Sequence, residues 1–178
     1  MVDVRDGWQT ARLTVEPLTP VHAREMHAVL ADPALHTFTG GEPRSPAELE
    51  ARYARLSGND SADGREVWGN WVLRVTSTGA AVGELQATLP GARPGDGPAL
   101  VAWVVGTEFQ GRGYASEAAV SLVDRLRAAG WSVAADIHPD HVASQRVAAA
   151  AGLTPTEEVV DGELRWARGA SATPGPAG

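Results

Sequence analysis

The segment Gln110-Gly111-Arg112-Gly113-Tyr114-Ala115 has the composition of an anion-binding turn. Glycine adopts backbone conformations that let consecutive N–H groups turn toward one point, and a helix that begins there adds its positive N-terminal end. Arg112 contributes a fixed positive charge whose planar donors match phosphate oxygens. The segment therefore predicts a phosphorylated cofactor as the simplest ligand.

Composition excludes several other chemistries. The chain has 178 residues and no Cys, and its fifteen basic residues are all Arg. Disulfides, thiolate nucleophiles and cysteine metal sites are therefore excluded, as are Schiff-base chemistry and a P-loop lysine. His22 and His27 lie five residues apart on one predicted helix, which is the wrong spacing for a shared metal, so we expect no metal.

The overall charge narrows the choice of partner. A formal net charge of −7 makes nucleic acid or an anionic membrane an improbable partner and fits a cationic acceptor better. No apolar stretch approaches the roughly 20 residues that cross a bilayer, and the N-terminus has no apolar signal region. We expect a cytoplasmic protein that is a monomer or a homodimer.

The elements that must position the glycine-rich turn follow from periodicity and capping. Alternation and apolar runs predict seven strands, at residues 12–16, 68–75, 81–89, 99–105 and 131–138 and on both sides of the turn at Asp161-Gly162. Capping residues and apolar stripes predict four helices, at residues 20–32, 46–58, 115–129 and 142–151. Residues 34–44 form a loop that is expected to admit a substrate.

These elements predict one α+β domain. A strand, a crossover helix and a strand around the turn imply a parallel pair within a mixed, mostly antiparallel sheet of about seven strands, with four helices packed on it. We place the domain at residues 11–168, after an N-terminal extension at 1–10 that shows no period. The last residues, 169–178, are small residues and proline, which predicts a disordered tail.

Two motifs resemble the GNAT superfamily of N-acetyltransferases over roughly residues 11–168. The signature Q/R-x-x-G-x-G/A is met by Gln110, Gly113 and Ala115. Downstream, residues 137–153 resemble the branch of ribosomal-protein N-terminal acetyltransferases (RimJ/RimL-like), which has an Asn, two residues and a Ser, and ends in Gly-Phe. The spacing holds here, although His141 replaces the Asn and Leu153 replaces the Phe.

The resemblance implies acetyl-CoA as co-substrate. The N–H groups from Gly111 to Ser116 would surround its pyrophosphate, with His141 as a further contact. In the family the strand before the turn splays from its parallel neighbour and pairs with the pantetheine arm through its backbone. Here that stretch is Trp103-Val104-Val105, and one of its N–H groups would polarise the thioester carbonyl.

Three side chains are candidates for the acid–base chemistry. Asp136 lies where some family members carry a catalytic Glu, and a partly desolvated carboxylate there would accept a proton. Glu84 is its competitor, on a strand that often borders the acceptor pocket. Many relatives use a Tyr on the last helix as the acid, but Ala148 stands there, so Ser144 is the candidate for stabilising the thiolate.

The leading hypothesis is transfer of an acetyl group to a primary amine of a small molecule or protein N-terminus. Because the chain lacks Cys, direct attack in a ternary complex is favoured over an acetyl-thiol intermediate. The acids of the final hairpin, at Glu157, Glu158, Asp161 and Glu163, could attract the amine, or simply form a solvated face. The alternative is a non-catalytic acyl-CoA-binding or sensing module, which fits the missing Tyr.

Overall fold

A computed structural model describes residues 6–58, 60–61, 63–91 and 93–168. The predicted tail at 169–178 lies outside the described residues, as do the first five residues of the predicted extension. No helix in the described part of the chain is long and apolar enough to cross a membrane.

The centre of the molecule is one mixed sheet of eight strands in the order β1-β2-β3-β4-β5-β6-β8-β7. Every neighbouring pair is antiparallel except β5 and β6, which run parallel with helix α3 as the crossover between them. The strands are β1 (Trp8–Gln9), β2 (Leu13–Pro17), β3 (Glu66–Val75), β4 (Ala81–Pro90), β5 (Ala99–Val105), β6 (Val133–Ile137), β7 (Thr154–Val160) and β8 (Glu163–Arg168).

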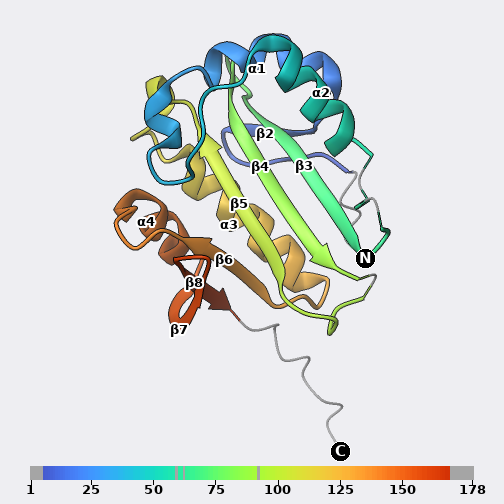
Figure 1. Cartoon of the computed structure of the whole chain (residues 1–178), viewed down its shortest axis with the longest axis vertical. Helices are drawn as coiled ribbons and strands as arrows, with labels where there is room; N and C mark the ends of the chain where they lie inside the picture. Colours follow the sequence, from blue (N-terminus) through green and yellow to red (C-terminus); the bar gives the residue numbers. More distant parts are fainter. Residues whose placement is uncertain (1–5, 59, 62, 92, 169–178) are drawn as a thin grey trace, which may run out of the picture.

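Helices cover both faces of this sheet (Figure 1). Adjacent residues of β3 show the alternation, because Val72 packs under α1 and α2 whereas Leu73 belongs to the core under α3. The helical segments are η1 (Pro20–His22), α1 (Ala23–Val29), η2 (Pro33–His36), α2 (Pro46–Leu56), η3 (Thr107–Phe109), α3 (Tyr114–Ala128) and α4 (Val142–Ala150).

Local sequence explains where the helices that border the site begin. Ser45 caps α2 through the predicted capping box, in which the Ser45 side chain accepts from the Glu48 N–H and Glu48 accepts from the Ser45 N–H at 2.8 Å. Gly113 is the residue before α3 and has φ 79°, a left-handed conformation in which a side chain would be strained. The apolar stripe of α3, including Leu122 and Leu126, is buried as the spacing predicts.

The predicted fold class is confirmed, with two local differences. Trp8–Gln9 forms a strand against β2, so the sheet has eight strands rather than about seven, and this part of the supposed extension is paired. The helix expected at 20–32 is shorter than predicted: a 3₁₀ turn at Pro20–His22 leads directly into α1, which ends at Val29. Asp32 is extended, because proline disfavours helical conformation in the preceding residue, and Pro33 begins a separate 3₁₀ turn.

The parallel joint between β5 and β6 is very short. Only two residue pairs are in register, Ala99 with Val133 and Leu100 with Ala134. Beyond Leu100, β5 continues along β4 as far as Val105, whereas β6 pairs only with β8. A wedge therefore opens between β5 and β6 toward the glycine-rich turn.

Candidate active site

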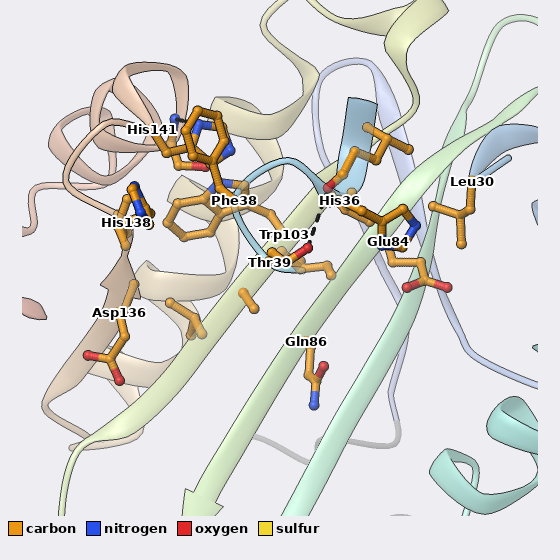
Figure 2. Close-up of a pocket in the computed structure, with 18 of the residues that line it drawn as sticks. Leu30, His36, Phe38, Thr39, Glu84, Gln86, Trp103, Asp136, His138 and His141 are labelled. Atoms are coloured by element: carbon orange, nitrogen blue, oxygen red, sulfur yellow. Dashed lines mark hydrogen bonds between the residues drawn. The ribbon is translucent and has the colours of Figure 1, made fainter. Parts of the chain in front are cut away.

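A cleft of about 330 Å³ opens beside this wedge (Figure 2). It lies under the 33–44 segment, and its walls come from α2, β4, β5, β6 and the start of α4. Predicted site residues in its lining are Glu84, Trp103, Val104, Asp136, His141 and Ser144. The predicted residues at 105 and 110–116 do not line this cleft: Val105 ends β5, and residues 110–116 form the later part of the turn after β5 and the first residues of α3.

The backbone of β5 turns unpaired groups toward the wedge. Ala99 donates its N–H to Ser132 on the β6 side at 2.9 Å, whereas Gly106 donates to Val82 on the β4 side at 2.9 Å. Because N–H directions alternate along a strand, Trp103 and Val105 present their N–H groups to the β6 side, beyond the two registered pairs. Val104 faces β4 instead, where Glu84 is its register partner.

The glycine-rich turn has the conformation that the sequence predicts. Gly111 and Gly113 have φ values of 73° and 79°, and both are exposed. Within the described part of the chain, the N–H groups of residues 111–116 have no hydrogen-bond partner and gather at the start of α3. Gln110 anchors the turn, because its side-chain amide donates to the Val105 carbonyl at 3.0 Å.

Arg12 holds the outside of the same turn. Its Nε donates to Glu117 at 2.6 Å, its Nη1 donates to the Arg112 carbonyl at 2.8 Å, and its guanidinium lies 5.0 Å from the centre of the Tyr114 ring. Arg112 itself folds back, with Nη2 donating to the Glu108 carbonyl at 3.1 Å. The exposed face of the turn thus carries the Arg112 guanidinium beside free N–H groups, which suits a diphosphate, whereas the charge of Arg12 is paired with Glu117.

Glu84 is the acid that β4 contributes to the cleft, and it is half-buried. Tyr53, which is fully buried, donates its hydroxyl to Glu84 Oε1. Burial raises the pKa of Glu84 above its usual value, against the hydrogen bond from Tyr53 and the positive charges of Arg52 and Arg44. Burial and the neighbouring carboxyl raise the pKa of Tyr53 as well, so the phenol stays a donor. Glu84 therefore has the properties of a general base.

Asp136 lies at the other side of the cleft and is already paired. Arg165 on β8 donates Nε to Asp136 Oδ1 at 2.8 Å and Nη2 to Oδ2 at 2.9 Å. Both oxygens are therefore committed to a bidentate ion pair, which makes Asp136 a poorer proton acceptor than Glu84. Arg165 has a second carboxylate partner, Glu158, at 2.7 Å.

Aromatic rings close the end of the cleft near α4. Phe38 stacks on His141 with ring centroids 4.4 Å apart, and His138 lies 5.3 Å from Phe38 (Figure 2). His141 caps α4, since its Nδ1 accepts the Ser144 N–H at 3.4 Å. Burial, with a smaller effect of His138, lowers the pKa of His141, which favours the neutral ring. Ala148, where relatives carry a Tyr, is buried in the core.

Comparison with protein families agrees with this geometry. The family model for the acetyltransferase (GNAT) domain matches residues 12–154. The chain belongs to the GNAT acetyltransferase family. The resemblance seen in the sequence is thus confirmed for the family, and a comparison with curated proteins finds no match.

Solved GNAT structures share this fold over most of the chain. A protein of Bordetella pertussis assigned to the GnaT acetyltransferase family is 25% identical, with a TM-score of 0.67 over 92% of this chain and 98% of that one. RimL, a ribosomal L7/L12 alpha-N-protein acetyltransferase solved with CoA, is 18% identical, with a TM-score of 0.73 over 94% and 100%. MccE, a microcin C7 self-immunity acetyltransferase solved with acetyl-CoA and AMP, is 11% identical, with a TM-score of 0.71 over 89% and 93%.

Sequence reasoning missed three notable residues of the cleft lining, Phe38, Arg44 and Arg52, and it missed Tyr53, which lies behind the lining as the partner of Glu84. Tyr53 was read only as part of the buried stripe of α2, although a tyrosine on an apolar stripe needs a partner for its hydroxyl. Phe38 had no periodic signal because it lies in a loop. Arg44 and Arg52 also line the cleft, and only the position of α2 over the sheet brings them there.

Proposed function

We propose that this protein is an acetyl-CoA-dependent N-acetyltransferase that acetylates a primary amine by direct attack in a ternary complex. The observation that carries the proposal is the combination, around one wedge in the sheet, of an anion-binding turn, unpaired strand N–H groups and the carboxyl of Glu84. Family membership supports it, and RimL and MccE are fold neighbours whose structures contain CoA and acetyl-CoA.

The residues present fit such a co-substrate. The left-handed glycines 111 and 113 leave the N–H groups of 111–116 open to a diphosphate, with Arg112 adding positive charge. The N–H groups of Trp103 and Val105 face the wedge between β5 and β6. An extended pantetheine arm with amide groups could accept hydrogen bonds from them there, in place of the strand pairing that β6 does not provide. Acetyl-CoA supplies the activated acyl group as a thioester when bound.

Side chains and backbone groups of the protein would then accept the amine proton and stabilise the charge that develops on the oxygen and the sulfur. Glu84 accepts one proton from the ammonium form of the acceptor, and the free amine forms a C–N bond to the acetyl carbon as the C–S bond breaks. The second amine proton goes to the departing sulfur, which leaves as a thiol. The N–H of Trp103 is the candidate donor to the carbonyl oxygen, and the hydroxyl of Ser144 to the sulfur.

One observation favours a second candidate, a non-catalytic acyl-CoA sensor. The position of the family's tyrosine acid is Ala148, which is fully buried and cannot donate a proton. Two measurements separate the candidates: calorimetry with acetyl-CoA, and thiol release with a panel of amines and N-terminal peptides. Binding with turnover supports the transferase, binding with no turnover on any acceptor supports the sensor, and no binding to either acetyl-CoA or CoA removes both.

A further inference from the structure

Two arginines line the cleft, one from α2 and one from the segment that leads into it. Arg44 immediately precedes the N-cap of α2, and Arg52 lies in the same helix next to Tyr53, the partner of Glu84. Both line the cleft together with Glu84. The cleft therefore has two fixed positive charges beside the carboxyl that we propose as the base.

These two guanidinium groups lack the partners that others in the chain have. Arg12, Arg74 and Arg165 each lie within 4.0 Å of a carboxylate, whereas within the described ranges no carboxylate oxygen lies that close to Arg44 or Arg52. Arg52 is half-buried, and burial lowers its pKa. A partly desolvated cation without a partner is unfavourable, so the cleft favours an anion beside it.

The acids of the cleft do not supply that anion. Asp136 is neutralised by Arg165 in a bidentate pair. Glu163 lies on the β8 side, near Asp136, whose negative charge together with burial raises the Glu163 pKa. Among the described groups that shift the pKa of Arg52, Glu84 is the only carboxyl. Burial raises the pKa of Glu84 and so favours its neutral form.

We propose that Arg44 and Arg52 bind a carboxylate or phosphate of the acceptor, so that the acceptor is a small zwitterionic amine with its anionic group a few bonds from the reacting nitrogen. The inference rests on the proposed transferase function. It differs from the cationic acceptor suggested by the net charge of −7, because local charge in the cleft, rather than total charge, contacts the ligand. Polyamines would meet two like charges there.

The size of the cleft favours a small acceptor. Its volume of about 330 Å³ is at the lower end of ligand pockets, and the acyl end of the co-substrate takes part of it. Phe38, stacked on His141, closes the side toward α4. The remaining space matches an amino acid or an aminoalkyl phosphate better than a folded protein surface.

Matched acceptors test the proposal. The panel pairs free amino acids with their carboxamides and aminoalkyl phosphates with the corresponding amino alcohols, together with a diamine and peptides with acidic N-terminal residues. We expect the anionic member of a pair to have a kcat/KM about 10- to 100-fold higher, the range for a charge-assisted hydrogen bond. Equal or better turnover of the neutral members, the diamine or the peptides would overturn the inference and leave acetyl transfer standing.

Variants of Arg44 and Arg52 test whether these residues cause the preference for anionic acceptors. Arg52→Gln and Arg44→Gln should raise KM for the anionic acceptor about 10-fold or more relative to KM for its neutral counterpart. Arg55→Gln is the matched control, because Arg55 is exposed on the same helix and does not line the cleft. An equal change for both acceptors in the Arg52 variant would contradict the assignment.

A binding measurement keeps the test independent of turnover. Calorimetry in the presence of CoA compares an N-acetylated amino acid with its carboxamide, on the wild type and on Arg52→Gln. Tighter binding of the acid by the wild type, lost in the variant, supports the anion site even if no acceptor in the panel is acetylated. Equal binding of acid and amide by the wild type overturns it, whatever the outcome for acetyl transfer.

Discussion

Glu84 is subject to opposing influences that together set when it can accept a proton. Burial favours the neutral carboxyl, whereas the Tyr53 hydroxyl and the charges of Arg52 and Arg44 favour the carboxylate. The balance raises its pKa, which brings a carboxyl group closer to the working range of a base near neutral pH. Asp136 has no comparable freedom, since Arg165 occupies both of its oxygens.

Replacing Glu84 tests this assignment directly. Glu84→Gln should lower kcat by about 10²- to 10⁴-fold, the usual range for a general base. In the wild type, kcat/KM should rise as pH rises through the raised pKa of Glu84, because only the carboxylate accepts a proton; the variant should lose this limb. A pH–rate profile measures both effects. Asp136→Asn is the comparison: if that variant loses the limb and Glu84→Gln keeps it, the roles are reversed.

The same variant has an expected effect on stability. A carboxyl whose pKa is raised by folding binds protons more tightly in the folded state, so its contribution to stability falls as pH rises above the unfolded value. Glu84→Gln removes this unfavourable term, so its Tm at neutral pH should equal or exceed that of the wild type. Lost activity with retained Tm would separate a chemical role from misfolding.

Tyr53→Phe tests the partner of Glu84. The hydrogen bond from Tyr53 stabilises the carboxylate, so its loss should raise the pKa of Glu84 further and move the rising, acid-side limb of kcat/KM to higher pH. Unfolding free energy should fall by about 1–2 kcal/mol, as for a buried hydrogen bond. Tyr114→Phe is the control, because Tyr114 lies at the start of α3 outside the cleft. An unshifted limb would mean that Tyr53 has only a packing role.

Sequence reasoning identified residues of this site but did not predict their hydrogen-bond and ion-pair partners. Trp103, Glu84, Asp136, His141 and Ser144 were all named, and all line one cleft. Their partners were not foreseen, because Tyr53 meets Glu84 across 31 positions and Arg165 meets Asp136 across 29. Such pairs depend on helix placement and strand register, which no local pattern encodes.

At the scale of elements, the turn between β5 and α3 is the part that local sequence determines best. Glycines at 111 and 113 have the left-handed conformation expected of them, and α3 begins at Tyr114, one residue before the predicted start. By contrast, β1 was missed because two residues are too few to show a period, and the helix predicted at 20–32 ends early, at Val29, with Asp32 extended before Pro33. Capping and turn chemistry are local, whereas sheet edges depend on distant strands.

Gly113→Ala tests the turn as an element. A side chain at φ 79° costs about 1–2 kcal/mol, and its Cβ would lie 3.2 Å from Nη2 of Arg12. The strain should displace the N–H groups and weaken acetyl-CoA binding about 10-fold or more, measured by calorimetry. Gly79→Ala is a matched control, since Gly79 has φ 72°, no atom within 4 Å of an added Cβ and a place in the distant β3–β4 hairpin. Equal losses of affinity in both variants would point to general destabilisation.

At the scale of the whole molecule, the N-terminal segment ties the sheet to α3. Trp8 packs edge-on against Trp71 at 5.1 Å, donates its indole N–H to Ser121 at 3.0 Å, and lies under the Arg125 guanidinium at 4.6 Å. Trp71 in turn donates to the Asp6 carbonyl at 2.9 Å. Residues 6–9 therefore belong to the folded domain, with Trp8 packed against its core.

Trp8→Ala should show this contribution. Loss of the ring contacts and the hydrogen bond should lower the free energy of unfolding by about 2–3 kcal/mol, below the range for a fully buried Trp because Trp8 is half-buried. Denaturant titration measures the change, which corresponds to roughly 4–12 °C in Tm. Val21→Ala is the control: the Val21 side chain is 81% exposed, so the free energy of unfolding should change little. An unaltered midpoint for Trp8→Ala would show that the segment is dispensable.

The two-pair joint between β5 and β6 has a dynamic consequence. Two parts of the sheet, β1–β5 and β6–β8, are joined there by only these two registered pairs, and α3 connects them along the chain. Amide hydrogens at Trp103 and Val105 should exchange rapidly with deuterium in the free protein and slowly once a ligand fills the seam, while the β3–β4 amides stay protected in both cases. A ligand bound between β5 and β6 should also restrict the motion of the two parts of the sheet relative to each other. Ligand binding would then change the dynamics of strands that lie far from the reacting groups.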